Sequence, residues 1–353
     1  MKVIVAMSGG VDSSVAAGLL RQQGCDVVGV TFRLNAENNL SGEAQAKAVT
    51  NILNIPHRVI DGQALFKERV LQFSWKEYSQ GRTPNPCVIC NERVKFELLT
   101  RELENTGADR LATGHYARLA TCPNGQPKLL RGVDGAKDQS YFLFSVHRDH
   151  LARSLFPNGE LTKSKVREVA VEFGLPNANR TESQDACIAQ DGHLSEVLRK
   201  RFSTEVRSGQ IVDKGGHVLG SHHGIHNFTI GQRKGTGVAL GRPAYVIAIN
   251  VGTREVVMGD DPVDLYAEGL IADGVRWLEE PVFDKPPQVE VQIRYQHHPV
   301  KASLQKNPDG KIEVSFSEPV RAVTPGQAAV FYSGEQVLGG GWIERAIHGE
   351  RRG

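Results

Sequence analysis

The sequence has no apolar stretch long enough to cross a membrane, and its first apolar run, residues 3–7, is too short for a signal-peptide core. It has only five cysteines in 353 residues. This odd, sparse set argues against a disulfide scaffold and favours thiol chemistry or a metal centre. A large net charge is also lacking, since the value is +2 at pH 7. These absences predict a soluble, cytoplasmic protein with no membrane partner, and overall charge does not predict a nucleic-acid partner.

A Walker A loop is missing too, because no G-x-x-x-x-G-K-[ST] pattern occurs in the chain. The first residues instead read VIVAM, residues 3–7, followed directly by SGGVDS, residues 8–13. This pattern predicts a buried strand, a glycine turn and a helix that opens near Ser13. Adjacent glycines allow positive φ and keep Cβ atoms away from the backbone, and a helix N-terminus offers unpaired N–H groups to an anion. A plain turn before a helix would have the same geometry.

The residue types favour a nucleotide loop over a plain turn. SGGVDS resembles the pyrophosphate loop of ATP pyrophosphatases, which adenylate a carbonyl or carboxylate oxygen and release pyrophosphate. The resemblance implies that ATP is cut between its α and β phosphates. The ATP-binding positions that it implies in this loop are Ala6, Met7, Ser8, Gly9, Gly10, Val11, Asp12 and Ser13.

Short apolar runs alternate with stretches of helical period through the first part of the chain. Further strands are expected at residues 26–32, 57–60 and 110–113. The alternation predicts a doubly wound α/β domain with a parallel sheet, and unbroken apolar runs fit strands covered on both faces. Ligands bind such sheets at the carboxyl ends of the strands, which is where the glycine loop falls.

Helical periodicity disappears past Leu198, and glycines become frequent between short β-prone runs. Runs at residues 289–293, 312–316 and 328–332 alternate with turn signals and predict a small antiparallel barrel. Residues 199–242 contain eight Lys or Arg against two Asp or Glu, with four of the twelve histidines. That balance is compatible with an RNA surface, although a charged run is most often a solvated face.

Two cysteines form a C-x-x-C motif, CVIC, at residues 87–90, after the segment TPNP and before a helical pattern. This position lowers a thiol's pKa and favours the reactive thiolate. Cys187 follows in another polar stretch. A redox pair, half of a zinc site and two buried structural thiols are the ordinary interpretations of C-x-x-C. A second C-x-x-C for zinc is missing, and the two prolines argue against a thioredoxin-type motif.

Seven motifs, in order, resemble those of tRNA-specific 2-thiouridylases, which put sulfur on the wobble uridine, position 34, of tRNAs for Lys, Glu and Gln. They are AMSGGVDS (6–13), TPNPCVICN (83–91), TGHYAR (113–118), KDQSY (137–141), ESQDAC (182–187), FTIGQRKG (228–235) and RAVTPGQ (321–327). The resemblance implies a pyrophosphatase-like α/β catalytic domain at residues 1–198. A small central β domain that contacts tRNA at residues 199–262 and a C-terminal β-barrel at residues 266–348 would follow.

The family's chemistry implies roles for the distant thiols. ATP, with Mg²⁺, would adenylate the uridine 2-carbonyl oxygen. Cys187 would then carry a persulfide, and Cys90 would be the nucleophile that releases its sulfur, leaving a transient Cys90–Cys187 disulfide. A persulfide-carrying protein or sulfide would be the sulfur donor. Cys25 and Cys122 match no motif and are expected to be structural or incidental. Phe32 and Gly114 would line the adenosine site of ATP, with an ordinary core aromatic as the alternative for Phe32.

Cys87 opens a second mechanism, because some family members have Asp at this position. Cys87, Cys90 and Cys187 could hold a [4Fe–4S] cluster with one open iron that binds sulfide. The sequence does not separate this route from the persulfide route.

The resemblance also implies RNA contacts, and the target base must leave the anticodon stack to reach ATP. The target-base region would be Asn85, Pro86 and Cys87. The positions expected to contact tRNA are His115, Lys137, Asp138, Gln139, Arg294, Tyr295 and Gln327. Two other interpretations are a synthetase or amidotransferase of the same loop class acting on a small carboxylate, and a non-catalytic RNA-binding protein.

Overall fold

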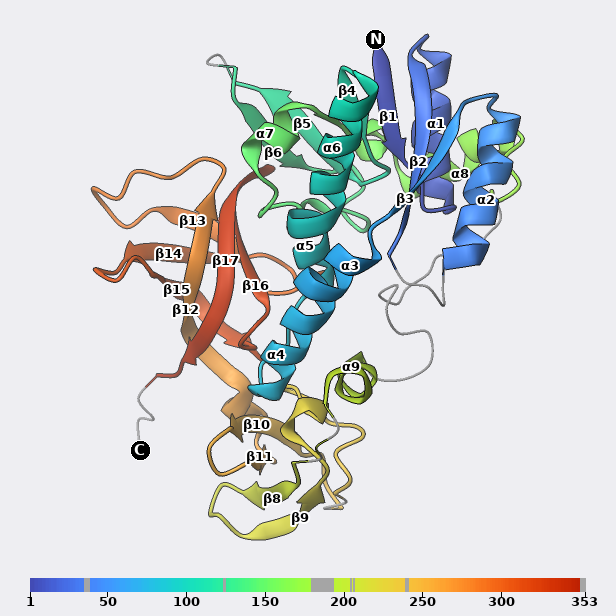
Figure 1. Cartoon of the computed structure of the whole chain (residues 1–353). Helices are drawn as coiled ribbons and strands as arrows, with labels where there is room; N and C mark the ends of the chain where they lie inside the picture. Colours follow the sequence, from blue (N-terminus) through green and yellow to red (C-terminus); the bar gives the residue numbers. More distant parts are fainter. Residues whose placement is uncertain are drawn as a thin grey trace. The chain divides into compact units, whose positions relative to one another are not determined.

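The computed structural model describes residues 1–34, 39–122, 125–178, 194–203, 205, 207–238 and 241–349, with the backbone alone at residues 39 and 40. The chain forms two units, and Figure 1 traces its course through them. The first unit is Met1–Val70, Cys87–Ile188 and Gly334–Leu338, and the second is Leu71–Pro86, Ala189–Ser333 and Gly339–Gly353. In the part of the chain that the structure describes, no helix is both long and apolar enough to span a membrane.

A five-stranded parallel sheet forms the centre of the first unit, as the sequence predicts. Its order is β3-β2-β1-β4-β7. From the central strand β1 the chain first builds the sheet toward β2 and β3 and later continues on the other side with β4 and β7. Sheets of this kind bind ligands at this switch point, beyond the carboxyl ends of the strands. The strands are β1 (Lys2–Ala6), β2 (Asp26–Arg33), β3 (His57–Asp61), β4 (Arg110–Ala112) and β7 (Ser154–Leu155).

Helices cover both faces of this sheet. Val3 and Val5 are fully buried in a cluster that includes side chains of α1, α2 and α8. Ile4 is equally buried on the opposite face, and α6 packs against β1 and β4. These helices are α1 (Val11–Gln22), α2 (Asn39–Ile52), α6 (Phe96–Thr106) and α8 (Lys163–Glu172).

Two longer helical stretches contain π-helical turns. In the first, α3 (Gln63–Phe66), a π turn at Lys67–Gln72 and α4 (Phe73–Ser79) follow one another. In the second, α5 (Pro86–Cys90) and a π turn at Asn91–Lys95 lead directly into α6. The first unit is completed by α7 (Arg148–Ala152) and a hairpin of β5 (Ala117–Thr121) and β6 (Pro127–Arg131).

The second unit contains a four-stranded sheet of order β10-β11-β8-β9, with α9 (Leu194–Phe202) near α4. Ile211, Val246 and Val256 are fully buried in its core. Its strands are β8 (Gly209–Asp213), β9 (Val218–His222), β10 (Tyr245–Asn250) and β11 (Glu255–Gly259).

The second unit also holds the antiparallel barrel that the sequence predicts. Six strands run in the order β12-β15-β14-β13-β16-β17, and β12 also pairs with β17, which closes the barrel. Closure leaves no free sheet edge. The strands are β12 (Tyr266–Trp277), β13 (Gln288–Gln292), β14 (Val300–Lys306), β15 (Ile312–Arg321), β16 (Ala328–Ser333) and β17 (Gln336–Ile347).

Candidate active site

The glycine loop between β1 and α1 requires glycine for two reasons. Gly9 has φ +80°, which side-chain-bearing residues rarely adopt. A Cβ at Gly9 would also lie 2.4 Å from the carbonyl oxygen of Gly42 in α2. The loop therefore combines an unusual backbone turn with close packing, and Gly→Ala at this position would disturb both.

Serine hydroxyls hold the loop from within. Ser13 Oγ accepts a hydrogen bond from Ser8 N at 3.2 Å and donates to Gly10 O at 3.1 Å, while Ser14 Oγ donates to the same carbonyl at 2.9 Å. Asn177 Nδ2 donates to Gly9 O, again at 2.9 Å. Among the described residues, no side chain caps α1 at Gly10. Its first N–H groups are therefore positioned to receive an anion.

Asp12, in the first turn of α1, lies in a cluster of hydrogen-bond donors. Lys163 Nζ is 2.7 Å from Asp12 Oδ1 and 2.9 Å from Oδ2, and Tyr116 OH donates to Oδ1 at 2.6 Å. Asn158 Nδ2 donates to the Asp12 carbonyl at 2.9 Å. The Lys163 side chain is 10% exposed. A nearly buried cation is thus held beside the loop where phosphates would bind.

The ends of two neighbouring strands approach the loop. Gly114, just past β4, packs so closely that a Cβ there would lie 2.7 Å from Asp12 C and Ser13 N. Met7 N donates to Val30 O of β2 at 2.8 Å. Phe32, near the end of β2, is half-buried. The structure therefore brings the implied ATP loop and Gly114 together.

The two cysteines of the C-x-x-C motif lie three residues apart on α5, a spacing that puts them on one helix face. Cys90 is 4% exposed, and Cys87 is half-buried. Cys187 and the rest of ESQDAC lie outside the described residues, so the Cys90–Cys187 pair stays a prediction. Within the described ranges, no group of three or more His, Cys, Asp or Glu could hold a metal ion.

His115 is enclosed by aromatic rings. It stacks on Phe96, with ring centroids 6.4 Å apart, and meets Phe156 edge-on at 6.2 Å. Its Nδ1 is 2.7 Å from Thr113 Oγ1. Burial, and to a lesser degree the nearby Lys95 charge, lowers the pKa of His115 to about 3. The ring is therefore neutral at pH 7 and is suited to a base or ribose contact rather than to a phosphate.

The next implied tRNA positions follow the β5–β6 hairpin. Asp138 is 9% exposed, and its carboxylate accepts hydrogen bonds from Arg131, Gly132 N and Ser140. Gln139 Oε1 accepts one from Tyr116 N at 3.1 Å. Asp138 thus organises the turn, the Gln139 side chain also binds protein backbone, and the RNA contacts of Lys137, Asp138 and Gln139 stay predictions.

In the second unit, Gln327 binds protein backbone. Its Nε2 donates to Thr83 O at 2.9 Å and to Pro84 O at 3.3 Å, directly before Asn85 and Pro86 of the implied target-base region. Thr83 N in turn donates to Pro325 O at 2.8 Å. The barrel segment around Gln327 therefore holds the TPNP segment.

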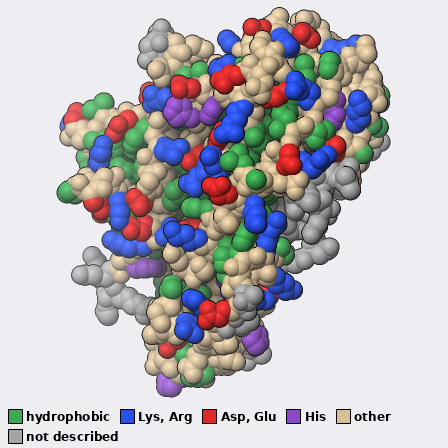
Figure 2. Space-filling model, in the orientation of Figure 1, with side chains coloured by type: hydrophobic (Ala, Val, Ile, Leu, Met, Phe, Trp, Pro, Cys, Tyr) green, Lys and Arg blue, Asp and Glu red, His purple; other side chains and the backbone are tan. Residues whose placement is uncertain are grey.

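Arg294 Nη1 donates to Arg321 O at 3.2 Å, and Tyr295 beside it is half-buried. On the face drawn in Figure 2, Lys and Arg side chains are interspersed with Asp and Glu. The charges on that face are therefore mixed, and the RNA contact of Arg294 and Tyr295 stays a prediction.

Sequence reasoning missed Lys163 and assigned no role to Tyr116, Asn158 or Asn177. One signal was available. Thr162 caps α8, with its hydroxyl accepting from Lys165 N, so Lys163 is the first helical residue. A cation there opposes the helix dipole, which indicates another reason for its presence.

A parallel sheet with a glycine loop at its switch point, followed by a four-stranded sheet and a closed barrel, defines a nucleotide-binding domain joined to two β domains. The chain matches the family models "tRNA methyl transferase HUP domain" at residues 1–191, "tRNA methyl transferase PRC-barrel domain" at 195–260 and "Aminomethyltransferase beta-barrel domain" at 267–343.

Curated relatives give the family its name. A protein from Lachnoclostridium phytofermentans is 45% identical over 97% of this chain and 99% of its own length, and one from Geotalea uraniireducens is 43% identical over 98% and 96%. Both are named "tRNA-specific 2-thiouridylase MnmA". The structure of a 4-thiouridine synthetase–RNA complex with bound ATP is 21% identical over 56% of this chain and 49% of the other, with a TM-score of 0.40. The chain belongs to the tRNA-specific 2-thiouridylase family.

Proposed function

We propose that the protein catalyses ATP-dependent 2-thiolation of the wobble uridine, position 34, in tRNAs for Lys, Glu and Gln. The observation that carries the proposal is the Asp12–Lys163–Tyr116 cluster at the glycine loop, in the same unit as the Cys87–Cys90 helix. The names of the relatives support the substrate, because both of those quoted are tRNA-specific 2-thiouridylases.

The first step is adenylation. The uridine O2 attacks the α-phosphorus of ATP, a P–O bond forms, and pyrophosphate leaves. The N–H groups at the start of α1 and the Lys163 ammonium stabilise the negative charge that develops on the phosphates. Mg²⁺, when bound, supplies further charge neutralisation, and Asp12 is the carboxylate that would hold it.

Sulfur transfer follows. The terminal sulfur of a Cys187 persulfide attacks C2 of the base, and AMP leaves with the former O2. The Cys90 thiolate then attacks the inner sulfur of Cys187, which breaks the S–S bond and leaves the outer sulfur on C2. The product is 2-thiouridine, together with a Cys90–Cys187 disulfide that a dithiol reductant must reduce before the next turnover.

The sulfur donor in this route is a persulfide-carrying protein. The alternative with a [4Fe–4S] cluster on Cys87, Cys90 and Cys187 takes inorganic sulfide instead, and no persulfide forms on Cys187. The two routes therefore differ in their iron requirement, their sulfur source and their dependence on Cys87.

An anaerobic thiolation assay tests the proposal. Protein of known iron content is incubated with ATP, Mg²⁺, unmodified tRNA and either sulfide or a persulfide donor, and 2-thiouridine is measured by mass spectrometry of the digested tRNA. Iron-free thiolation that Cys187→Ala abolishes is the expected result. Thiolation that needs iron and accepts sulfide would replace the persulfide step with the cluster. Pyrophosphate release on a small carboxylate, without any thiolated tRNA, would overturn the function.

A further inference from the structure

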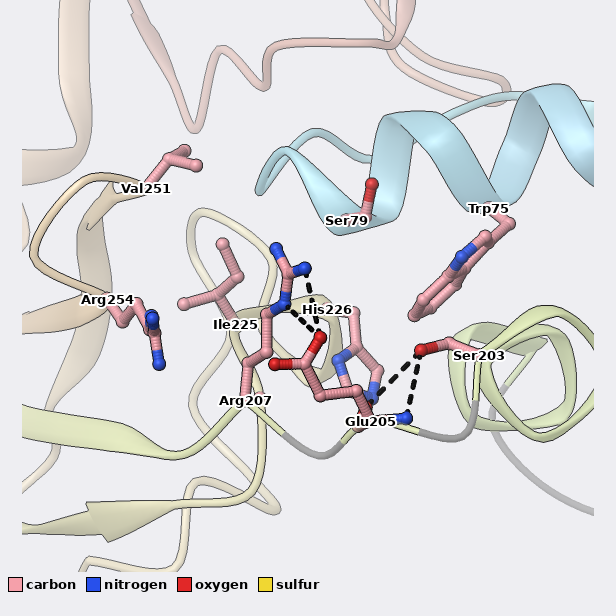
Figure 3. Close-up of a pocket in the computed structure, with 10 residues that line it drawn as sticks. Trp75, Ser79, Ser203, Glu205, Arg207, Ile225, His226, Val251 and Arg254 are labelled. Carbon is pink, nitrogen blue, oxygen red and sulfur yellow. Dashed lines mark hydrogen bonds and ion pairs between the residues drawn. The ribbon is translucent and has the colours of Figure 1, made fainter.

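A cavity of about 210 Å³ is lined by residues of the second unit, whereas the glycine loop belongs to the first. Figure 3 shows its wall, which comes from α4, from Ser203, Glu205 and Arg207 after α9, from the residues after β9 and from the β10–β11 turn. Ligand sites for drug-sized molecules have roughly 300–1,000 Å³. This cavity is therefore suited to a smaller group, the size of one nucleobase or ribose.

One wall of the cavity is aromatic. Trp75 of α4 is half-buried and meets the His226 ring edge-on, with centroids 5.5 Å apart. His226 is 6% exposed, and its Nε2 lies 3.1 Å from Glu196 Oε2. Arg199 in turn binds Glu196 at 2.6 Å. The indole is thus supported by a buried ring that the half-buried Glu196–Arg199 pair holds in place, and Figure 3 shows the indole directed toward that ring.

The other side of the cavity is cationic. Arg207 and Arg254 are both exposed, and Figure 3 shows Arg254 on the side opposite Trp75 and Arg207 between them, beside Glu205. Arg207 forms an ion pair with Glu205, two residues earlier, at 3.0 Å. Within the described part of the chain, no ion pair involves Arg254. Two arginines, Arg207 and Arg254, thus line the cavity together with one acidic residue, Glu205.

The backbone at Arg254 is also unusual. Its φ is +59°, a conformation that residues with a Cβ seldom adopt. His222 Nε2, 2.9 Å from Arg254 O, helps to hold it there. Strained residues persist where the surrounding structure fixes them, and they cluster at binding sites. The turn therefore presents an arginine with a fixed backbone at the rim of the cavity.

We propose that this cavity binds one nucleotide of the tRNA, outside the target-base site, with its base or ribose against Trp75 and its phosphate on Arg254 and Arg207. An aromatic wall opposite guanidinium groups is how proteins hold unpaired nucleotides. This inference rests on the proposed function, because it takes tRNA as the substrate. It adds a second point of contact, formed by α4 and by the region that matches the PRC-barrel model at residues 195–260, to the predicted contacts near the reacting base.

Two variants and one control test this site. Arg254→Gln removes the rim charge, and Trp75→Leu removes the ring. The control is Arg110→Gln, at the first residue of β4 and so at the end of the strand away from the loop. Binding of unmodified tRNA is measured by filter retention at several salt concentrations, and thiolation gives kcat and the KM for tRNA.

We expect Arg254→Gln to weaken tRNA binding about three- to tenfold at 0.1 M salt. The slope of log affinity against log salt concentration should become less steep by about one. Trp75→Leu should weaken it by about tenfold, with kcat at saturating tRNA unchanged. Part of the tryptophan fluorescence quenching by tRNA should also disappear in Trp75→Phe.

Unchanged Kd and KM for tRNA in Arg254→Gln, with normal thiolation, would overturn the site and leave the proposed function intact. If Arg254→Gln slowed thiolation with a persulfide-carrying protein as the sulfur donor but left tRNA binding unchanged, the site would also be overturned. The cavity would then contact a protein partner instead of tRNA. If wild-type protein neither binds nor thiolates tRNA, the proposed function itself fails. Because Arg254 is exposed, its variant keeps the test decisive even where Trp75→Leu does not fold.

Discussion

Lys163 is the residue whose role depends most on tertiary structure. It is the first residue of α8, yet its ammonium binds both oxygens of Asp12, 151 residues away in the chain. Lysine is seldom this buried without a partner. The ion pair fixes the ammonium beside the loop before any nucleotide binds, so this donor is already in position for a phosphate.

Lys163→Met should lower the rate of pyrophosphate release by about 10²–10³-fold, as loss of one stabilising charge typically does. The matched control is Lys165→Met, two residues further along α8, where the side chain is exposed and pairs with Glu168. Steady-state kinetics with varied ATP and Mg²⁺ measure the effect. If Lys163→Met released pyrophosphate at the wild-type rate but unfolded at a lower temperature, the role of Lys163 would be structural only.

Cys90→Ser should abolish 2-thiouridine formation while pyrophosphate release continues, because the thiol acts after adenylation. Under the persulfide route Cys87→Ser keeps thiolation within about threefold, since Cys87 takes no part in the exchange. Cys122→Ser, in the half-buried position after β5, is the control. Mass spectrometry of tRNA and a pyrophosphate assay on the same samples separate the two steps. Loss of thiolation in Cys87→Ser would favour the cluster route.

His115 makes stability depend on pH. Its pKa is about 3 in the folded protein against 6.5 in the unfolded chain. Between these values the unfolded state binds the extra proton, so stability is lost as pH falls from 6.5 toward 3. His115→Gln should lessen the fall in unfolding free energy between pH 7.5 and pH 5 by on the order of 1 kcal/mol. Urea unfolding at both values measures this, and an equal fall in the two proteins would contradict it.

At the level of elements, the junction of β4 with the glycine loop is a close contact between two segments far apart in the sequence. A Cβ at Gly114 would lie 2.7 Å from the Asp12 and Ser13 backbone. Gly114→Ala should therefore move the start of α1 and raise the KM for ATP by at least about tenfold, since misplaced donors stabilise phosphate poorly. Gly135→Ala is the matched control, because a Cβ there meets nothing within 4 Å. An unchanged KM for ATP in Gly114→Ala would mean that the loop relaxes without loss of function.

Local sequence patterns predict the elements that depend on neighbouring residues. Four of the five parallel strands and three of the six barrel strands follow from apolar runs and turn signals. The helical pattern expected after the C-x-x-C motif instead begins before it, at Pro86. Proline at the first position, the β-branched Val88 and Ile89, and the π turn at Asn91–Lys95 all obscure the helical period.

The site could be predicted only where its chemistry is contiguous in sequence. The glycine loop and the C-x-x-C motif are each within one short segment. The partners of Asp12 are not, since Tyr116 lies 104 residues away and Lys163 lies 151 away. The role of Gln327 is similarly remote, because its partner Thr83 is 244 residues earlier. Only a folded structure brings such pairs together.

For the whole molecule, charge should limit how tightly RNA is held. The net charge is +2, and the charges on the face shown in Figure 2 are mixed. Affinity must then come from a few placed cations, of which Lys137, Arg207, Arg254 and Arg294 are the predicted phosphate contacts. Four such contacts give a slope of roughly −3 to −4 in log affinity against log salt, or about a hundredfold loss between 50 and 200 mM KCl.

Filter binding of unmodified tRNA at four KCl concentrations measures this slope, and thiolation at saturating tRNA is followed in the same buffers. The KM for tRNA should rise with salt while kcat at saturating tRNA stays level, because salt screens exposed charges that meet RNA more than it screens the Lys163 ammonium, which is 10% exposed. Each arginine replaced by Gln should then make this negative slope less steep by about one. A slope near zero would mean that base stacking rather than phosphate contact supplies the affinity, and a kcat that fell with salt would place exposed charges in the reaction itself.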